Sequence, residues 1–285
     1  MQKLPEWLIK RVPKASNMRK VRELIGDNSI HTVCESASCP NIGECFSKKT
    51  VTFMILGDIC TRGCKFCGVE KLSKPLPRLD SARHKLDPLE PQKIALAAKK
   101  LGSEYIVITS VTRDDLPDQG ADHFILTVSE IRKVMPKAQI ELLVPDFWAD
   151  EGLISKIVDI KPNILAHNVE MAPSLYSRLR PSSDYLRSLK VLKIAKNRNS
   201  LLYTKSGFML GLGEKKDEVI GLMKDLRSVD CDILTIGQYL QPSKDQVEVS
   251  EFVHPDIFAD YKRIAEELGF IKVVSGPFVR SSYRV

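Results

Sequence analysis

Three cysteines stand at a spacing suited to iron–sulfur chemistry. Cys60, Cys64 and Cys67 follow the apolar run 51–56, with three and then two residues between them. Cysteine thiolates hold iron–sulfur cubanes, normally one thiolate for each iron. Three thiolates for four irons leave one iron open, and the amino and carboxylate groups of S-adenosylmethionine can chelate an open iron. Iron–sulfur clusters and S-adenosylmethionine are both cofactors of radical chemistry. Phe66 can pack beside such a site.

A structural zinc loop is the alternative for these three cysteines. Zinc requires a fourth Cys or His ligand close by, and after Cys67 none follows until His84. The spacing resembles the signature of the radical S-adenosylmethionine enzymes, and it is a specific one.

A second cysteine triplet precedes the first along the chain. Cys34, Cys39 and Cys45 lie in a segment whose turn residues, such as Pro40, let three sulfur atoms point to one centre. Alone this spacing is weak evidence, and His31 would complete a zinc site. Beside an iron–sulfur loop, a second cluster is the better interpretation.

Composition limits the remaining possibilities. The chain has 285 residues, 43% of them hydrophobic and 28% charged, which is typical of a soluble globular protein. Its net charge of +7 is scattered, which permits an acidic protein partner but does not predict nucleic-acid binding. No secretory signal and no apolar segment long enough to span a bilayer is visible, so we expect a cytoplasmic protein. The seventh cysteine, Cys231, stands alone and is predicted to be a small buried residue entering a strand.

Short apolar runs alternate with helical patterns from residue 51 onward. Helical spacing of apolar residues begins near Ile94, Phe124, Leu153, Tyr185, Val219 and Ile257. The candidate strands between these helices are Val51–Leu56, Tyr105–Ile108, Ile140–Val144, Ile164–His167, Tyr203–Leu210 and Ile233–Ile236. Such alternation predicts an α/β fold with parallel strands and right-handed crossovers. A closed eight-unit barrel needs about 250 residues for the barrel alone, so we expect an open six-unit (β/α)6 partial barrel.

Three segments make up the expected domain organisation. Residues 1–50 form an N-terminal extension with the first cysteine triplet and a short helix near residues 18–24. Residues 51–270 form the partial barrel, and residues 271–285 form a polar C-terminal tail.

Polar residues follow the predicted strands, where this architecture places chemistry. Ser110 follows the second strand, Asn168 and Glu170 follow the fourth, and Tyr239 follows the sixth. We expect Asn168 to bind a ribose and Glu170 an ammonium group. For each residue a structural role remains open, and Asp114 and Asp115 fit a solvated turn equally well.

Four further motifs accompany the two cysteine triplets, namely Pro40–Glu44, Gly57–Cys64, Val111–Leu116 and Arg280–Tyr283. With them, nearly the whole chain resembles the lipoyl synthases, a family of radical S-adenosylmethionine enzymes. The departures from the family pattern are small and touch no cluster ligand: Ser36 in place of an acidic residue, Phe46 in place of Trp and Gln119 in place of Gly.

The resemblance implies two [4Fe–4S] clusters and S-adenosylmethionine as cofactors. Cys60, Cys64 and Cys67 would hold the cluster that cleaves S-adenosylmethionine. Cys34, Cys39 and Cys45 would hold an auxiliary cluster that supplies sulfur, with Ser282, or failing that Ser281, as its fourth ligand. The S-adenosylmethionine contacts would be Phe66, Ser110, Asn168, Glu170 and Tyr239.

The activity implied is insertion of two sulfur atoms at carbons 6 and 8 of an octanoyl group, amide-linked to a lysine of a carrier domain. The partners implied are the acyltransferase subunits of 2-oxoacid dehydrogenases, the glycine cleavage H protein, and an electron donor such as flavodoxin or ferredoxin. Two alternatives remain: another radical S-adenosylmethionine enzyme that inserts sulfur or methylthiolates, and a non-catalytic zinc or electron-transfer module.

Overall fold

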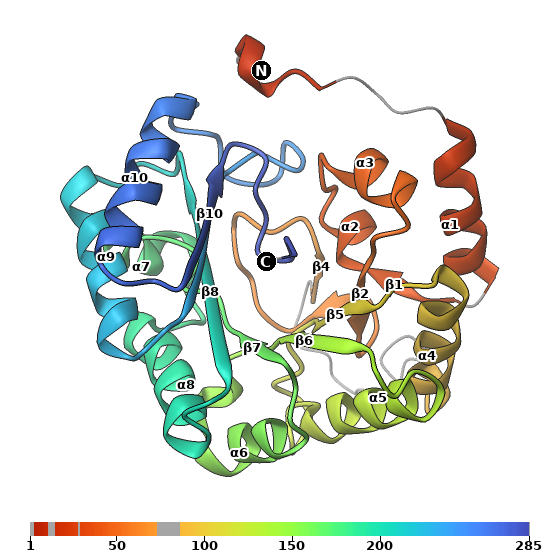
Figure 1. Ribbon diagram of the computed structural model, residues 1–285. Coiled ribbons are helices and arrows are strands. Elements are labelled where there is room, and N and C mark those ends of the chain that lie inside the picture. The colour runs from red at the N-terminus through yellow and green to blue at the C-terminus, as the bar shows by residue number, and fades with distance from the viewer. Residues whose placement is uncertain (1–2, 11–14, 28, 73–85, 285) are drawn as a thin grey trace. The chain divides into compact units, whose positions relative to one another are not determined.

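A computed structural model describes residues 3–10, 15–27, 29–72 and 86–284 of the chain (Figure 1). The chain divides into two compact units. The C-terminal unit comprises Met1–Arg11, Cys64–Phe66 and Ile164–Val285, and the N-terminal unit comprises Val12–Gly63 and Cys67–Asn163.

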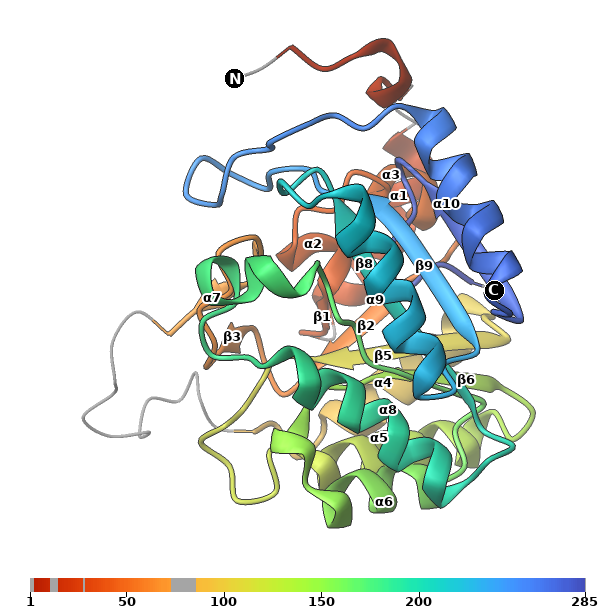
Figure 2. The same cartoon turned by 90° about the vertical axis from the view of Figure 1, so that its left-hand side faces the viewer.

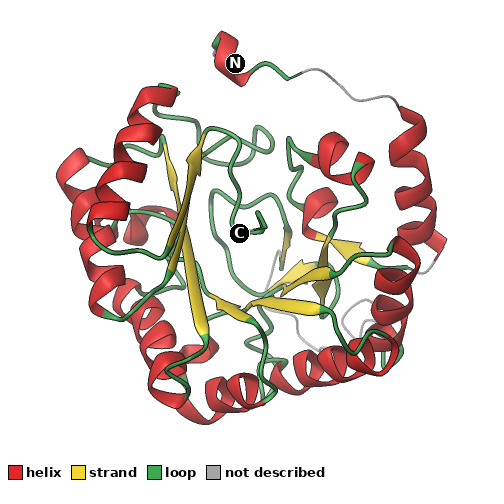
Figure 3. Cartoon of the chain, viewed as in Figure 1, coloured by secondary structure: helices red, strands yellow, loops and turns green. Residues whose placement is uncertain are grey.

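The N-terminal unit is built on four strands in the order β1-β2-β5-β6: His31–Thr32, Thr52–Ile55, Tyr105–Ser110 and Gln139–Leu143. β1 pairs antiparallel with β2, and the other pairs are parallel. Helices α4 (Glu90–Leu101), α5 (Ala121–Val134) and α6 (Glu151–Asp159) cover one face of this sheet (Figure 3). The shorter elements are α1 (Ala15–Asp27), α2 (Val33–Ser36), α3 (Ile42–Ser47) and the parallel pair β3 (Ile59–Cys60) and β4 (Glu70–Lys71).

The C-terminal unit has four parallel strands in the order β7-β8-β9-β10: Ile164–Ala166, Tyr203–Leu210, Ile233–Gln238 and Lys272–Gly276. Its helices are α7 (Tyr176–Leu179), α8 (Tyr185–Arg198), α9 (Lys216–Ser228) and α10 (Pro255–Glu267). Figure 2 shows α9 and α10 beside β9, and their apolar faces bury Leu222, Met223 and Phe258. Burial of these stripes against the sheet stabilises the unit, at roughly 25 cal/mol per Å² of apolar surface removed from water.

The alternation predicted from the sequence is confirmed in both units. Each of the six predicted strands is present within two residues of its expected bounds, and a helix covers each predicted helical pattern. The short helix expected near residues 18–24 is α1, which is longer than expected. The sequence did not predict β10, which pairs with β9 from Lys272 to Gly276, so the C-terminal segment enters the sheet before it becomes a tail.

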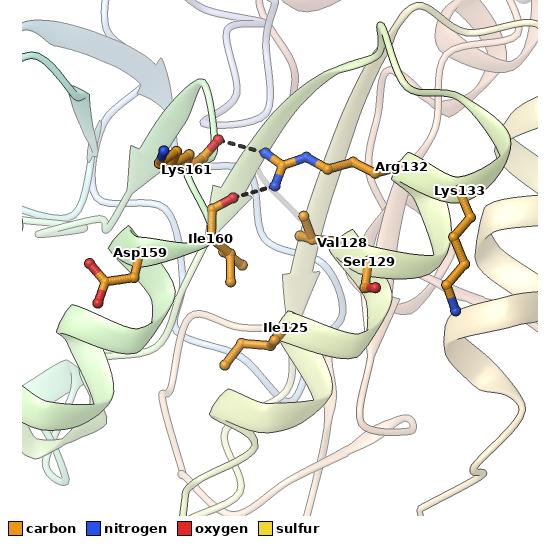
Figure 4. Close-up of a pocket in the computed structure, with 8 residues that line it drawn as sticks. All are labelled: Ile125, Val128, Ser129, Arg132, Lys133, Asp159, Ile160 and Lys161. Atoms are coloured by element: carbon orange, nitrogen blue, oxygen red, sulfur yellow. Dashed lines mark hydrogen bonds between the residues drawn. The ribbon is translucent and has the colours of Figure 1, made fainter.

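A groove on the N-terminal unit is lined by α5 and the C-terminal end of α6 (Figure 4). Within it, Arg132 of α5 donates hydrogen bonds to the carbonyl oxygens of Ile160 and, at 2.6 Å, Lys161. These bonds satisfy carbonyl groups just beyond α6, which lack partners within that helix. Asn163 holds the same region to the start of β6, because its side chain accepts from Ile140 N at 2.8 Å. The groove therefore belongs to the end of the unit where strands begin, opposite the ends expected to carry chemistry.

Candidate active site

The N-terminal triplet, Cys34, Cys39 and Cys45, lies on two short helices and the turn between them. Cys34 is in α2, and Cys39 N donates to Cys34 O at 3.0 Å. Cys45 is in α3, where its N–H donates to Asn41 O at 2.9 Å. These bonds fold the twelve-residue segment from Cys34 to Cys45 back on itself.

The three thiols of this triplet are near one another. Burial raises the pKa of the Cys34 thiol to about 12, and the nearby thiolates of Cys39 and Cys45 raise it as well. Hydrogen bonds with Thr52 act in the opposite direction, because they stabilise the Cys34 thiolate. Cys39 and Cys45 are half-buried. A set of three thiols, two of them close to that of Cys34, fits the ligand set of an iron–sulfur cubane.

The central triplet, Cys60, Cys64 and Cys67, begins at the end of β3. The chain reaches it through Leu56 and Gly57, which have φ angles of 70° and 86°. A left-handed Leu is unfavourable, and two buried charged residues hold it. Leu56 N donates to Glu90 at 2.9 Å, and Arg113 donates to Leu56 O at 3.4 Å.

Arg62, between Cys60 and Cys64, is the centre of a buried ion network. Its guanidinium donates to both oxygens of Asp114, at 2.9 and 2.8 Å, and to both oxygens of Asp146, at 2.8 and 2.7 Å. Its side chain is 4% exposed, and that of Asp146 is fully buried. Burial opposes the charge of Arg62, but its bonds to the two carboxylates outweigh burial and raise the arginine pKa. The network therefore fixes the loop that carries Cys60, and Arg62 N lies 3.5 Å from the Cys60 sulfur.

Strained backbone accompanies this network at the end of β6. Phe147, Trp148 and Ala149 all have positive φ angles, of 44°, 52° and 53°. Such conformations are unfavourable for residues other than glycine and persist where the surroundings impose them. The centroid of the Trp148 ring lies 4.9 Å from the Arg62 guanidinium, which is an attractive cation–π contact.

Asp114 and Asp115 do not form a solvated turn. Asp114 binds Arg62, and Asp115 binds Arg113 through three hydrogen bonds of 2.7 to 3.1 Å. The sequence pattern assigned no role to Arg62 or Asp146. The position of Arg62 inside the cysteine motif is the one signal that could have indicated it.

Residues 64–66 belong to the C-terminal unit. Lys65 N donates to Leu179 O at 2.8 Å, and Val247 N donates to Lys65 O at 3.0 Å. Phe66 packs against the hydrophobic core of this unit. Arg180 is buried close enough to Cys64, Glu170 and Tyr176 for their negative charges to help raise its pKa against the effect of burial.

Asn168 and Glu170 meet at the end of β7. Asn168 Nδ2 donates to Glu170 Oε1 at 3.2 Å, and Asn168 Oδ1 is buried without a hydrogen-bond partner. Burial raises the pKa of the Glu170 carboxyl, while the charge of Arg180 and the amide of Asn168 oppose the rise. Glu170 has a φ of 67°, and its backbone bonds to Gly207 O and Met209 N hold this conformation. Both side chains line a small cavity together with Phe208, Val279 and Ser281.

The other predicted contacts differ in environment. Ser110 ends β5 in the N-terminal unit, and its buried hydroxyl has no hydrogen-bond partner. Tyr239 is 2% exposed, and its hydroxyl donates to Val247 O at 2.7 Å. Tyr239 is therefore part of the core, and its ring is also the largest of the fully buried side chains. Ser282 lies in the half-exposed C-terminal tail.

No three or more His, Cys, Asp or Glu side chains among the described residues form a group that could hold a single metal ion. The thiolates of a cubane bind different irons, so this observation concerns single-ion sites alone. Within the same residues, no helix has the length and apolar character needed to cross a bilayer.

Two lipoyl synthases are similar to this chain over almost its full length. The enzyme of Caldicellulosiruptor saccharolyticus is 51% identical over 281 residues, which cover 99% of this chain and 95% of that protein. The enzyme of Caldanaerobacter subterraneus subsp. tengcongensis is 51% identical over 279 residues, 98% of this chain and 94% of that protein. The chain belongs to the lipoyl synthase family.

The model of the radical SAM superfamily matches residues 54–226. The crystal structure of methylornithine synthase is similar in fold, with a TM-score of 0.57 and 15% identity over 90% of this chain and 75% of that chain. The chain therefore has the radical SAM fold, an α/β fold with a mostly parallel sheet. As a lipoyl synthase family member it is a radical SAM enzyme, and its cofactors are S-adenosylmethionine and two [4Fe–4S] clusters. The family, enzyme class and cofactors predicted from the sequence are confirmed.

Proposed function

We propose that this lipoyl synthase family member inserts two sulfur atoms at carbons 6 and 8 of an octanoyl group that is amide-linked to a lysine of a carrier domain. The observation that carries the proposal is 51% identity to a lipoyl synthase over 99% of the chain. The close thiols of Cys34, Cys39 and Cys45 support it, because a second cluster is what sulfur insertion requires beyond radical generation.

The cysteines would hold the two clusters. Cys60, Cys64 and Cys67 would bind the cluster that leaves one iron for S-adenosylmethionine, and the N-terminal triplet would bind the auxiliary cluster. Ser282, with Ser281 as the alternative, would be the fourth protein ligand there. A serine oxygen is a harder ligand than a thiolate and suits iron less well. Such a ligand fits a cluster that must lose iron as its sulfide is consumed.

Side chains at the strand ends would bind S-adenosylmethionine. The unpartnered Asn168 Oδ1 can accept a ribose hydroxyl, and the Glu170 carboxylate can accept from the ammonium group. Ser110 has a buried hydroxyl available for the same ligand, and Phe66 and Tyr239 would contribute packing. The buried, unpaired polar atoms fit a polar ligand, because such atoms are rarely left without a partner in native proteins.

In this reaction the protein mainly positions the reacting atoms, and acid–base catalysis by side chains contributes little. An unactivated C–H bond has no acidic proton, so side-chain bases cannot open it. When bound, the cofactors supply a 5′-deoxyadenosyl radical and sulfur. The chain's own residues would then hold the octanoyl carbons within reach of the radical and of the sulfur source, and would keep other molecules away from the radical.

We extend the proposal to architecture and partners. Residues 51–270 would form an open (β/α)6 partial barrel, residues 1–50 an N-terminal extension with auxiliary-cluster cysteines, and residues 271–285 a C-terminal tail with the serine motif. The substrates would be the acyltransferase subunits of 2-oxoacid dehydrogenases and the glycine cleavage H protein, and flavodoxin or ferredoxin would supply electrons. Seven cysteines in one chain, six of them proposed as cluster ligands, are in keeping with a cytoplasmic location.

An assay with an octanoylated carrier domain tests the function. Anaerobically purified and reconstituted protein should contain two four-iron clusters and should convert the octanoyl domain to lipoyl product with a reductant and S-adenosylmethionine. Ser282→Ala should still form 5′-deoxyadenosine yet make little lipoyl product. Ser282→Cys, a tighter thiolate ligand, should keep the auxiliary cluster and also hinder its breakdown. Wild-type product from both variants would assign the ligand role to Ser281 or water, and no product from the unaltered enzyme would refute the function itself.

A further inference from the structure

A fully buried lysine lies in the middle of β8. Lys205 pairs in register with Ala166 of β7 and Ile233 of β9, and it is among the largest side chains with no exposed surface. Burying an ammonium group is unfavourable unless it is well hydrogen-bonded. A lysine at this depth therefore needs an acceptor that the fold itself provides.

The C-terminal tail provides such an acceptor. Lys205 Nζ donates to the carbonyl oxygen of Tyr283 at 2.9 Å, across 78 positions of sequence. Gly207 lies two residues further along β8 and therefore on the same face. A Cβ atom at Gly207 would lie 3.3 Å from Asn168 Oδ1. The face of β8 that approaches Asn168 at Gly207 thus also carries the lysine that holds the tail.

The tail forms a turn with the two serines at its centre. Tyr283 N donates to Arg280 O at 2.9 Å, which closes a four-residue turn whose middle residues are Ser281 and Ser282. The hydrogen bond from Lys205 Nζ is made to the carbonyl oxygen of Tyr283, the last residue of this turn.

The beginning of the turn is held by β9. A Cβ atom added to Gly237 would lie 2.2 Å from Val279 O, so only glycine lets the tail approach the strand there. Pro277 O also accepts from Gln238 N at 3.4 Å. The turn is therefore fixed on one side by the close approach of Val279 to Gly237, and on the other by Lys205.

We propose that Lys205 and Gly237 are positioning residues that fix the turn Arg280–Tyr283 and thereby set the place of the serine that binds the auxiliary cluster. The inference rests on the proposed function, since it gives the turn its purpose. A charged donor makes a stronger hydrogen bond to a carbonyl than a neutral one, and a chain end is otherwise prone to fray. An apolar residue of similar volume at position 205 would leave the Tyr283 carbonyl without this donor.

Lys205→Met tests the inference, because methionine fills much of the same volume without an ammonium group. The matched control is Lys196→Met, which removes a half-buried ammonium that pairs with Asp232 at 2.6 Å in the same unit and has no role in the tail. Hydrogen exchange of residues 277–284 should become roughly tenfold faster or more in the Lys205→Met holoenzyme, as expected for loss of a charge-assisted bond. The Lys196→Met holoenzyme should keep wild-type exchange in this segment.

The activity of the same holoenzymes separates positioning from general stability. Lys205→Met should form 5′-deoxyadenosine within roughly twofold of wild type, yet make about tenfold less lipoyl product. A merely structural role would lower both products together. Gly237→Ala is a second variant that acts on the opposite side of the turn, and hydrogen exchange of residues 277–284 should become faster in it as well if Lys205→Met fails to fold.

The outcomes distinguish this inference from the function on which it rests. Unchanged exchange in the tail of both variants would overturn the inference whatever the enzyme does. Faster exchange with normal lipoyl product would also overturn it if Ser282→Ala is inactive, because the serine would then need no fixed turn. If Ser282→Ala and Ser281→Ala both make normal product, the proposed serine ligand fails instead.

Discussion

The two cysteine triplets are held by different physical means. Around Cys60 the backbone is fixed by buried charged groups, with Arg62 between Asp114 and Asp146, and Glu90 on Leu56 N. Around Cys34 and Cys45 the backbone is fixed by the hydrogen bonds of short helices and by apolar packing, with Phe46 fully buried. A charge network allows few arrangements, because a displaced member leaves a charge buried and unpaired. Short helices with an apolar anchor adapt more easily.

This difference matches the tasks proposed for the two clusters. The central triplet would have to return to one geometry after every turnover, because the open iron of its cluster would position S-adenosylmethionine. The auxiliary cluster would be consumed and rebuilt, so its ligands must release and accept iron. A rigid loop suits the first task, and half-exposed thiols on short helices suit the second.

The largest effect should come from removing one triplet at a time. Replacing Cys60, Cys64 and Cys67 together with Ala should halve the bound iron and sulfide and abolish reductive cleavage of S-adenosylmethionine. Replacing Cys34, Cys39 and Cys45 should also halve the iron but leave cleavage intact, because the radical is generated elsewhere. Iron, sulfide and 5′-deoxyadenosine are measured in both proteins, and unchanged cleavage in the first would refute the assignment.

The next largest effect should distinguish the two supports. Arg62→Met removes the cation that pairs with the fully buried Asp146, so the free energy of unfolding should fall by about 3–5 kcal/mol. Phe46→Leu in the other support removes only part of an apolar side chain and should lower it by less than about 1.5 kcal/mol. Denaturant unfolding of the two apo-proteins gives the comparison. Equal losses would mean that the charge network is no more rigid than apolar packing.

Much of the fold was visible in the sequence, since it depends on local spacing, and the proposed cluster ligands rest on local spacing as well. Apolar runs marked β2 and β5, and the cysteine intervals marked both triplets. The Arg62–Asp146 pair was not visible, because its members are 84 positions apart and neither residue type is unusual by itself. Lys205 was hidden for the same reason, since its acceptor is a backbone carbonyl that no sequence pattern reveals.

Strand β10 was missed because its sequence breaks the apolar pattern. Only Val273 is buried among its residues, and Ser275 and Gly276 read as the start of a turn. β10 is held by backbone pairing with β9, which its side-chain pattern does not indicate. Backbone pairing and ion pairs between residues far apart in the sequence are therefore the features that the sequence pattern could not predict.

A third prediction concerns the ligand contact of Glu170. The carboxylate form is the one that pairs with an ammonium group, and burial raises the pKa of this carboxyl in the free protein. Affinity for S-adenosylmethionine should therefore increase as pH rises through that elevated pKa and level off above it. At the plateau, Glu170→Gln should bind about 1.5–3 kcal/mol more weakly, the range for a hydrogen bond to a charged group.

Calorimetric titration of wild type and Glu170→Gln across pH checks this contact. The variant should lose the rise with pH along with the affinity, because glutamine does not titrate. A variant with the wild-type dissociation constant at every pH would mean that Glu170 serves the fold alone.

The smallest effect is expected at Cys231, which sharpens the comparison between the triplets. Burial raises the pKa of its thiol to about 12, the same value as for Cys34. What distinguishes the two cysteines is their neighbours, because Cys34 lies near Cys39 and Cys45, whereas the Cys231 sulfur lies 3.5 Å from Ile233 O and 3.8 Å from Thr204 O.

Cys231→Ala should therefore leave the iron and sulfide content of the holoenzyme unchanged and lower the free energy of unfolding by about 1 kcal/mol, as is common for a small truncation in a core. Cys34→Ala should cost a similar amount of apo-protein stability while also reducing auxiliary iron. Metal analysis beside denaturant unfolding separates the two effects. Lost iron in Cys231→Ala would show that burial and a raised pKa, rather than the proximity of other thiols, mark the cluster ligands of this chain.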